Sequence, residues 1–171
     1  MKRSAFTLIE VLVAIGIIVL LAGVTVPLFS MVKARGESAK CLGNLRSLGV
    51  ALSAYLAEHD STMPDLKAGR ASRNEDVPVI DNTLNSYVDD QRVFACPSDR
   101  RYFRETGTSY YWNSALNGQR LAALNLFGMV SDLGRIPVLV DKEGWHTYSD
   151  NKVNHLFADG HATKELRLFT E

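Results

Sequence analysis

The chain has 171 residues with nineteen basic and nineteen acidic side chains, so its formal net charge is zero. This balance argues against a nucleic-acid surface, which normally needs a clear basic excess, and the length suits one globular domain plus an appendage. The mean hydropathy of -0.04 hides an asymmetry, because the chain is overwhelmingly apolar up to about Met31 and mixed in composition beyond it.

The N-terminal apolar run predicts a membrane-spanning helix. From residue 11 to 31 only Thr25, Pro27 and Ser30 interrupt the aliphatic side chains, and about 20 apolar residues cross a bilayer core. A cleaved secretory signal has a shorter apolar region of about 7–15 residues. A lipoprotein signal is disfavoured because Val24, and not a cysteine, follows the LLAG sequence.

Glu10 distinguishes this helix from a plain membrane anchor. An acid at the centre of a membrane helix costs roughly 2.5 to 3.5 kcal/mol, and an intramembrane acid indicates function with a partner to be named. The natural partner is an amine. Cleavage between Ala5 and Phe6 would create one a helical turn away, on the same chain or on a neighbouring one.

The run FTLIEVLVAIGIIVLLAGVTVP, after a short basic leader, resembles the N-terminus of type IV prepilins and type II secretion pseudopilins. The resemblance implies that a prepilin peptidase cuts between Ala5 and Phe6 and methylates the new amine of Phe6. It also implies that Glu10 attracts the N-terminus of an adjacent subunit, and that the helix is interrupted near Pro27. The sequence departs from the family at Ala5, where glycine is usual.

We therefore predict four segments. They are a leader peptide (1–5), a transmembrane and filament-core helix (6–29), its amphipathic continuation (30–60) and an α+β globular head (61–171). The resemblance implies a single-pass inner-membrane protein with its head in the periplasm, and then a periplasmic or cell-surface filament. The implied partners are the prepilin peptidase/N-methyltransferase, other pilin-like subunits and the inner-membrane assembly platform, with no nucleic acid.

The second half of the helix is predicted to pack on the head. Apolar residues recur there at the helical spacing of three and four, and Pro64 favours a helix end soon after Asp60. Gly36 is a predicted weak point between the two halves. The apolar stripe consists of Leu45, Leu48, Leu52, Tyr55 and Leu56.

The head is predicted to be a small antiparallel sheet against this helix, which gives an α+β pilin-like fold. Strands are expected at 93–95, 107–113 and 136–141, and a final pair is expected around a two-residue turn at Asp159-Gly160. The TLNSYVDD segment favours a short helix. The segment 114–134 is expected to be a short helix or an irregular loop.

Three further segments carry a second resemblance. AKCLGNLRSLGVALSAYLAEHDSTMP, VFACPSDR with SYYWNS, and NHLFADGHA are similar to pseudopilin-like proteins with a C-terminal H-x-DG motif. Neither His146 nor His155 stands at the usual distance from Asp159, so no role of the motif histidine is transferred.

Cys41 and Cys96 are predicted to form a disulfide in an exported head. A bridge closing so long a loop stabilises by a few kcal/mol in chain-entropy models, on the order of 4 kcal/mol. The alternative is two buried free cysteines. A metal site on two thiolates alone is disfavoured because structural zinc takes four ligands.

Several polar side chains follow late in the sequence, namely Asp141, His146, His155, Asp159 and His161. The preferred interpretation is turn and surface chemistry with no metal and no cofactor. Calcium is the favoured ion for the alternative, with Asp141, His155, Asp159 and His161 as candidate ligands. The preferred role of the aromatic residues Tyr110, Tyr111 and Trp112 is packing in the core, and the alternative is a platform that binds a ligand.

The sequence therefore predicts a structural subunit of a type II secretion pseudopilus or a related type IV filament, and not an enzyme. No nucleophile elbow, phosphate-binding loop or paired zinc-ligand motif is present. Two alternatives stay open. One is a single-span membrane-anchored periplasmic binding protein, and the other is a membrane-anchored metallohydrolase that uses the late His/Asp group.

Overall fold

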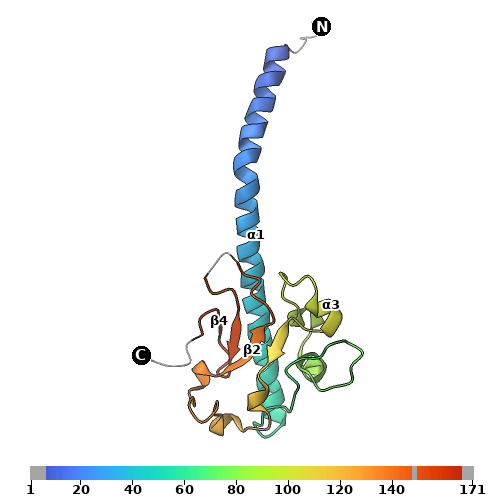
Figure 1. The fold of residues 1–171 in the computed structure, drawn as a ribbon, viewed down its shortest axis with the longest axis vertical. Coiled ribbons are helices and arrows are strands. Elements are labelled where there is room, and N and C mark those ends of the chain that lie inside the picture. Colours follow the sequence, from blue (N-terminus) through green and yellow to red (C-terminus); the bar gives the residue numbers. More distant parts are fainter. Residues whose placement is uncertain (1–6, 148–149, 167–171) are drawn as a thin grey trace.

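The computed structural model describes residues 7–147 and 150–166, and one helix dominates it. Helix α1 (Leu8–Glu58) is 51 residues long. Its N-terminal part projects alone, and the remaining chain is gathered around its C-terminal part (Figure 1). We call residues 8–33 the stalk. The structure keeps α1 continuous through Gly36 and Pro27, although proline has no N–H for the helical hydrogen bond to residue 23.

The C-terminal part of α1 forms one wall of the hydrophobic core. Leu45 and Leu48 are fully buried, and Leu52 and Leu56 are nearly so. They face strands β3 and β4 and the short 3₁₀ helices η1 and η2. Burying one leucine side chain is worth about 1.5–3 kcal/mol, so this stripe fastens the helix to the head as its spacing predicts.

The head contains a four-stranded antiparallel sheet in the order β1-β2-β3-β4. The pairs include Tyr110↔Asp141 and Val140↔His155, with an irregularity in β2 between Pro137 and Leu139. Together with α1 this confirms the predicted α+β fold class. The strands are β1 (Tyr110–Trp112), β2 (Pro137–Asp141), β3 (His155–Phe157) and β4 (Ala162–Thr163).

Short helices interrupt the irregular segments that make up most of the remaining head. The strand predicted at 93–95 is wrong, because this segment belongs to η2, where the Asp90 side chain accepts a hydrogen bond from the backbone N–H of Arg92. The short helix predicted in the TLNSYVDD segment is present as the 3₁₀ helix η1, while α2 ends at the first residue of that segment. The full set is α2 (Ile80–Thr83), η1 (Asn85–Tyr87), η2 (Gln91–Phe94), α3 (Tyr102–Thr106), η3 (Ser114–Leu116), η4 (Leu121–Ala123) and η5 (Leu133–Arg135).

The turn between β3 and β4 lies where the Asp159-Gly160 pair predicts it, but it is one residue longer. Phe157 N–H donates to the carbonyl of His161, and Gly160 N–H donates to the carbonyl of Phe157, both at 2.9 Å. Only Gly160 has a positive φ, of 88°. This is the pattern of a three-residue hairpin loop that ends in a left-handed glycine.

Candidate functional site

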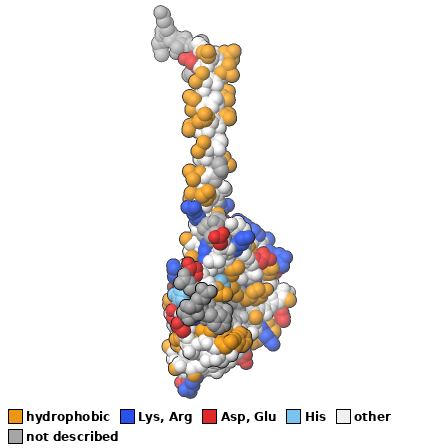
Figure 2. Space-filling model, turned by 60° about the vertical axis from the view of Figure 1, so that its left-hand side comes forward, with side chains coloured by type: hydrophobic (Ala, Val, Ile, Leu, Met, Phe, Trp, Pro, Cys, Tyr) orange, Lys and Arg blue, Asp and Glu red, His pale blue; other side chains and the backbone are white. Residues whose placement is uncertain are grey.

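The stalk exposes apolar side chains on all sides. Every stalk side chain that the structure describes is exposed, including Leu20 at 69% and Phe29 at 69%. Figure 2 shows this apolar surface giving way to charged side chains where the stalk meets the head. By length and composition α1 is able to cross a membrane, since its most apolar window has a mean hydropathy of 2.8. A helix that is apolar all round requires an apolar surrounding.

Glu10 closes the first turn of α1 through a capping box with Thr7. Its Oε2 accepts hydrogen bonds from Thr7 N–H at 2.8 Å and from Thr7 Oγ1 at 2.7 Å. The Thr7 hydroxyl accepts in turn from Glu10 N–H at 3.4 Å. The Thr-x-x-Glu spacing is the sequence signature of this cap, so Glu10 has a local structural role in addition to its charge.

The predicted processing site, between Ala5 and Phe6, lies outside the described residues. It nevertheless adjoins the cap, because Phe6 directly precedes Thr7. The amine that cleavage would create is therefore a chain neighbour of the residue that binds the Glu10 carboxylate.

A second polar group lies inside the head. Cys41 of α1, Cys96 after η2, Asp141 at the end of β2 and His146 in the next loop converge there. Their potential ligand atoms all lie within 4.8 Å of one another, and all four residues are buried. We call these four residues the buried cluster.

Direct contacts join members of the buried cluster. Cys41 Sγ lies 3.3 Å from Asp141 Oδ1, His146 Nε2 lies 3.3 Å from Asp141 Oδ2, and Cys96 Sγ lies 3.7 Å from His146 Nε2. The predicted Cys41–Cys96 disulfide is not formed, since both residues are free thiols. Cys41 of α1 and Cys96 of the head both contact other members of the buried cluster, so they link α1 to the head without a covalent bond.

These contacts change the acidity of the group. The partner thiol of Cys41 lowers the pKa of Cys96 to about 6, against the effect of burial, while the same contact and burial raise the pKa of Cys41. Burial lowers the pKa of His146, but the hydrogen bonds to Asp141 and Cys96 outweigh it and raise the value to about 9. The cluster thus favours a Cys96 thiolate beside a His146 imidazolium.

The late His/Asp group does not form one site. Asp141 and His146 are buried in the cluster, whereas Asp159 and His161 form an exposed ion pair at the hairpin turn. His155 lies in β3 and its ring faces that of Phe157. The proposed four-residue calcium set is therefore not brought together.

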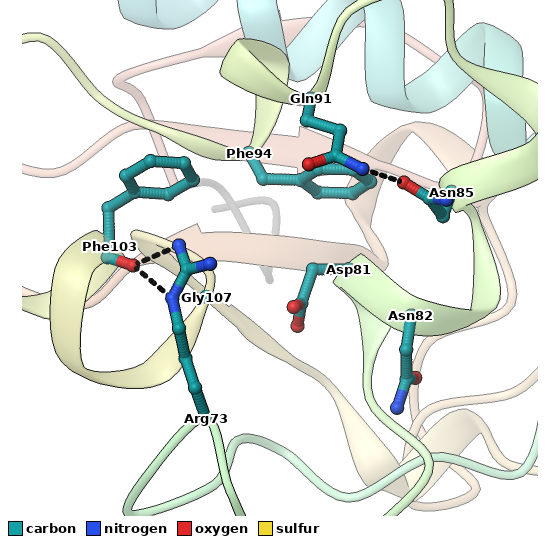
Figure 3. A pocket seen from close by; sticks show the side chains of 8 residues that line it. All are labelled: Arg73, Asp81, Asn82, Asn85, Gln91, Phe94, Phe103 and Gly107. Atoms are coloured by element: carbon teal, nitrogen blue, oxygen red, sulfur yellow. Dashed lines mark hydrogen bonds between the residues drawn. The ribbon is translucent and has the colours of Figure 1, made fainter.

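A hollow beside α2 is one candidate ligand pocket for the binding-protein alternative (Figure 3). Several of its polar groups already bond within the head: Arg73 donates to the Phe103 carbonyl at 2.7 Å, and Gln91 donates to Asn85 at 2.8 Å. Asp81 pairs with Arg70, although burial raises the pKa of this carboxyl group. The lining residues are Arg73, Asp81, Asn82, Asn85, Gln91, Phe94, Phe103 and Gly107.

The aromatic strand serves mainly as core. Tyr110 and Trp112 are buried, and Trp112 Nε1 donates to Asn117 Oδ1 at 2.7 Å, while Tyr111 is 41% exposed. Packing is therefore the main role of β1, as interpreted from the sequence.

In a comparison with known families, residues 1–26 match the model described as Prokaryotic N-terminal methylation motif. No significant match was found among curated proteins or among solved structures. The matched segment contains Glu10 and most of the stalk but no part of the head. The H-x-DG resemblance of the head stays a prediction.

Proposed function

We propose that the chain is a structural subunit of a type II secretion pseudopilus or a related type IV filament, because its residues 1–26 match the Prokaryotic N-terminal methylation motif. A prepilin peptidase cleaves it between Ala5 and Phe6 and methylates Phe6. The stalk first spans the inner membrane with the head in the periplasm. It then enters the core of a periplasmic or cell-surface filament with other pilin-like subunits, through the inner-membrane assembly platform.

The proposal rests mainly on two features together: the methylation motif, and the stalk that it largely includes, which no other described residue covers. The stalk is apolar around its whole circumference and packs on no other element. A lipid bilayer satisfies such a surface, and so does a bundle of identical helices. A plain membrane anchor would lie only in the lipid bilayer, and it would not need the methylation motif.

Glu10 supplies the direction of assembly. In the single chain its carboxylate is bound by neutral donors of Thr7. A carboxylate in apolar surroundings is costly unless it is paired. The Phe6 amine of an adjacent subunit supplies the missing positive charge, so that assembly gains a favourable ion pair at one defined height.

In-cell cysteine crosslinking along residues 11–26, with the assembly machinery present, tests the proposal. Val13→Cys and Ile17→Cys give self-crosslinks or crosslinks to other pilin-like subunits if stalks pack side by side. The native cysteines are buried and do not interfere. Absence of such crosslinks in the otherwise wild-type chain would sink the filament proposal.

Glu10→Gln then separates the charge of Glu10 from its capping role, because glutamine also accepts the capping-box hydrogen bond. We expect Glu10→Gln and Glu10→Ala to be inserted yet to lose the crosslinks. Thr25→Val is the matched control, since the Thr25 hydroxyl bonds within its own helix to the Leu21 carbonyl at 2.7 Å. Normal crosslinking of Glu10→Gln would refute the ion-pair account and leave capping as the role of Glu10.

Mass analysis of the native N-terminal peptide checks processing independently. The expected mature chain begins at a methylated Phe6 and depends on the peptidase. A retained Met1 in a stable membrane protein would favour the single-span binding protein instead.

A further inference from the structure

The buried cluster brings together four side chains of three donor types, two thiols, a carboxylate and an imidazole, from separate parts of the chain. Cys41 is 0% exposed, Cys96 1%, Asp141 4% and His146 1%. All four side chains are ionisable, and an ionisable group so deep in a core is costly unless it is paired or binds a metal. The convergence therefore needs a physical reason beyond packing.

The separations resemble the edges of a ligand tetrahedron. Bond lengths of 2.3 Å for Zn–S and about 2.0–2.1 Å for Zn–N and Zn–O give ligand–ligand edges of roughly 3.3 to 3.8 Å. The distances Cys96 Sγ to His146 Nε2 (3.7 Å), His146 Nε2 to Asp141 Oδ2 (3.3 Å) and Cys41 Sγ to Asp141 Oδ1 (3.3 Å) all fall on this scale. The remaining separations lie within 4.8 Å, so closing a tetrahedron would draw the longest of them in by up to about 1 Å and would use one oxygen of Asp141 as the ligand.

Neighbouring groups hold the carboxylate in place. Asp141 Oδ2 accepts hydrogen bonds from the backbone N–H and the side-chain amide of Asn154, both at 2.8 Å. The Tyr110 hydroxyl lies 3.5 Å from Cys41 Sγ. Such outer contacts orient first-shell ligands in metal sites, so the cluster has a supporting shell as well as four ligands.

A Cys–His catalytic site fits the geometry less well. In a nucleophile–base–carboxylate relay the carboxylate binds the imidazole nitrogen opposite the nucleophile. Here both Cys96 and Asp141 face Nε2 of His146, and its buried Nδ1 has no hydrogen-bond partner among the described residues. The burial of all four side chains also denies access to a substrate.

We propose that Cys41, Cys96, Asp141 and His146 form a structural site for a divalent transition metal of the zinc class, which fastens α1 to the head. Two thiolates, an imidazole and a carboxylate make a closed four-ligand set of the structural kind. Sulfur and nitrogen donors favour this class over calcium, which takes six to eight oxygens. The inference does not depend on filament assembly.

Metal binding to the purified full-length chain in detergent, under reducing conditions, tests this site with Zn²⁺ and Co²⁺ as probes. We expect one metal ion per chain, a thiolate-to-Co²⁺ charge-transfer absorption, release of thiol protons, and a saturable rise in the thermal midpoint. Bound Zn²⁺ should also protect both cysteines from alkylation.

Two ligand variants and one control make the test specific. Cys96→Ser should abolish the charge-transfer band of one thiolate, and Asp141→Asn should weaken Co²⁺ binding at least about tenfold, the lower end for disturbing a metal site. Asp141→Asn keeps an oxygen for the Asn154 donors, so it preserves the fold if Cys96→Ser does not. Asp159→Ala removes the exposed carboxylate at the hairpin turn and should change nothing.

Three results would overturn the proposal. One is a Cys41–Cys96 disulfide in protein taken carefully from its host. Another is reduced wild-type protein with free thiols that binds neither Zn²⁺ nor Co²⁺ saturably. The third is Co²⁺ binding that survives unchanged in both Cys96→Ser and Asp141→Asn.

Discussion

The two parts of helix α1 present the same side chains to opposite surroundings. Leu20 in the stalk is 69% exposed, whereas Leu48 on the head side is fully buried. The stalk is apolar on every face, while the head part has an apolar stripe with exposed residues such as Arg46 and Ser47 beside it. One continuous helix therefore has two side-chain patterns, each suited to a different surrounding.

This difference shows what the apolar period of a helix indicates about the surroundings of that helix. A 3.6-residue apolar period arises where a partner covers one face only and water covers the other. The head is such a one-sided partner. The stalk has no such apolar period. This pattern suits surroundings that are apolar in every direction, as in lipid or in a helical bundle. Absence of amphipathicity is here evidence about the environment of the helix.

The largest expected effect comes from the same truncation made in both parts. Leu48→Ala should lower the free energy of unfolding of the head by about 2–5 kcal/mol, because it leaves a cavity in the core. Leu20→Ala should change it by less than about 0.5 kcal/mol. Denaturation of the full chain in detergent, followed by the fluorescence of Trp112 and Trp145, measures both. A similar loss in the two variants would contradict the division of α1.

Glycines of α1 offer a finer comparison inside the head part. Alanine stabilises a helix by about 1 kcal/mol relative to glycine, and a Cβ at Gly43 would meet nothing within 4 Å. At Gly49 the Cβ would lie 3.0 Å from Leu156 Cδ1 and 3.4 Å from the Gly160 carbonyl oxygen. Such overpacking costs about 1–3 kcal/mol.

We therefore expect Gly43→Ala to raise the thermal midpoint and Gly49→Ala to lower it. Differential scanning calorimetry of the two variants decides the matter. If Gly49→Ala were as stabilising as Gly43→Ala, the close contact between α1 and the β3–β4 hairpin would be wrong.

Long elements of the fold were predictable and short ones were not. The spacing of Leu45, Leu48 and Leu52 and the β-branched run at 136–141 indicate their elements directly. Helices η2 and α3 depend instead on local side-chain caps. The Asp99 carboxylate accepts from the backbone N–H groups of Tyr102 and Phe103 at 2.8 and 2.7 Å, and such a cap outweighs the weak strand propensity of a few residues.

The sequence identified all four members of the buried cluster but assigned them to two different groups. The two cysteines predict a disulfide, whereas Asp141 and His146 belong to the late polar group with His155, Asp159 and His161. The missing information is tertiary: β2 ends with Asp141 facing α1, and the loop after it returns His146 to the same place. The hairpin loop carries Asp159 outward, and sequence proximity does not show that separation.

The head also differs from the stalk because it contains a partly buried charged side chain, Lys142. Its protonation makes the stability of the head depend on pH. Burial lowers the pKa of Lys142 to about 8, while its Nζ donates to Thr106 Oγ1 at 2.6 Å. Between about pH 8 and the ordinary lysine pKa of about 10.4, the unfolded chain binds a proton that the folded chain has released. Stability contributed by this group therefore rises with pH across that window.

Comparing Lys142→Met with the wild-type chain isolates this contribution. The wild type should gain free energy of unfolding relative to the variant between pH 8 and pH 10, as measured by urea denaturation. Lys67→Met, at an exposed position, is the control. Parallel pH profiles of wild type and Lys142→Met would show that Lys142 is solvated.

The smallest expected effect concerns the first turn of the stalk. An N-cap threonine is worth about 0.5–2 kcal/mol to its helix, but the turn that Thr7 caps lies far from the core and frays without unfolding the head. We expect Thr7→Ala to speed hydrogen exchange at the amides of residues 8–10 in detergent and to leave the thermal midpoint unchanged. Glu10→Gln keeps an acceptor for Thr7 N–H and should exchange more slowly than Thr7→Ala. Should Thr7→Ala lower the midpoint by several degrees, the stalk would be energetically coupled to the head, and the two parts of α1 would not be independent.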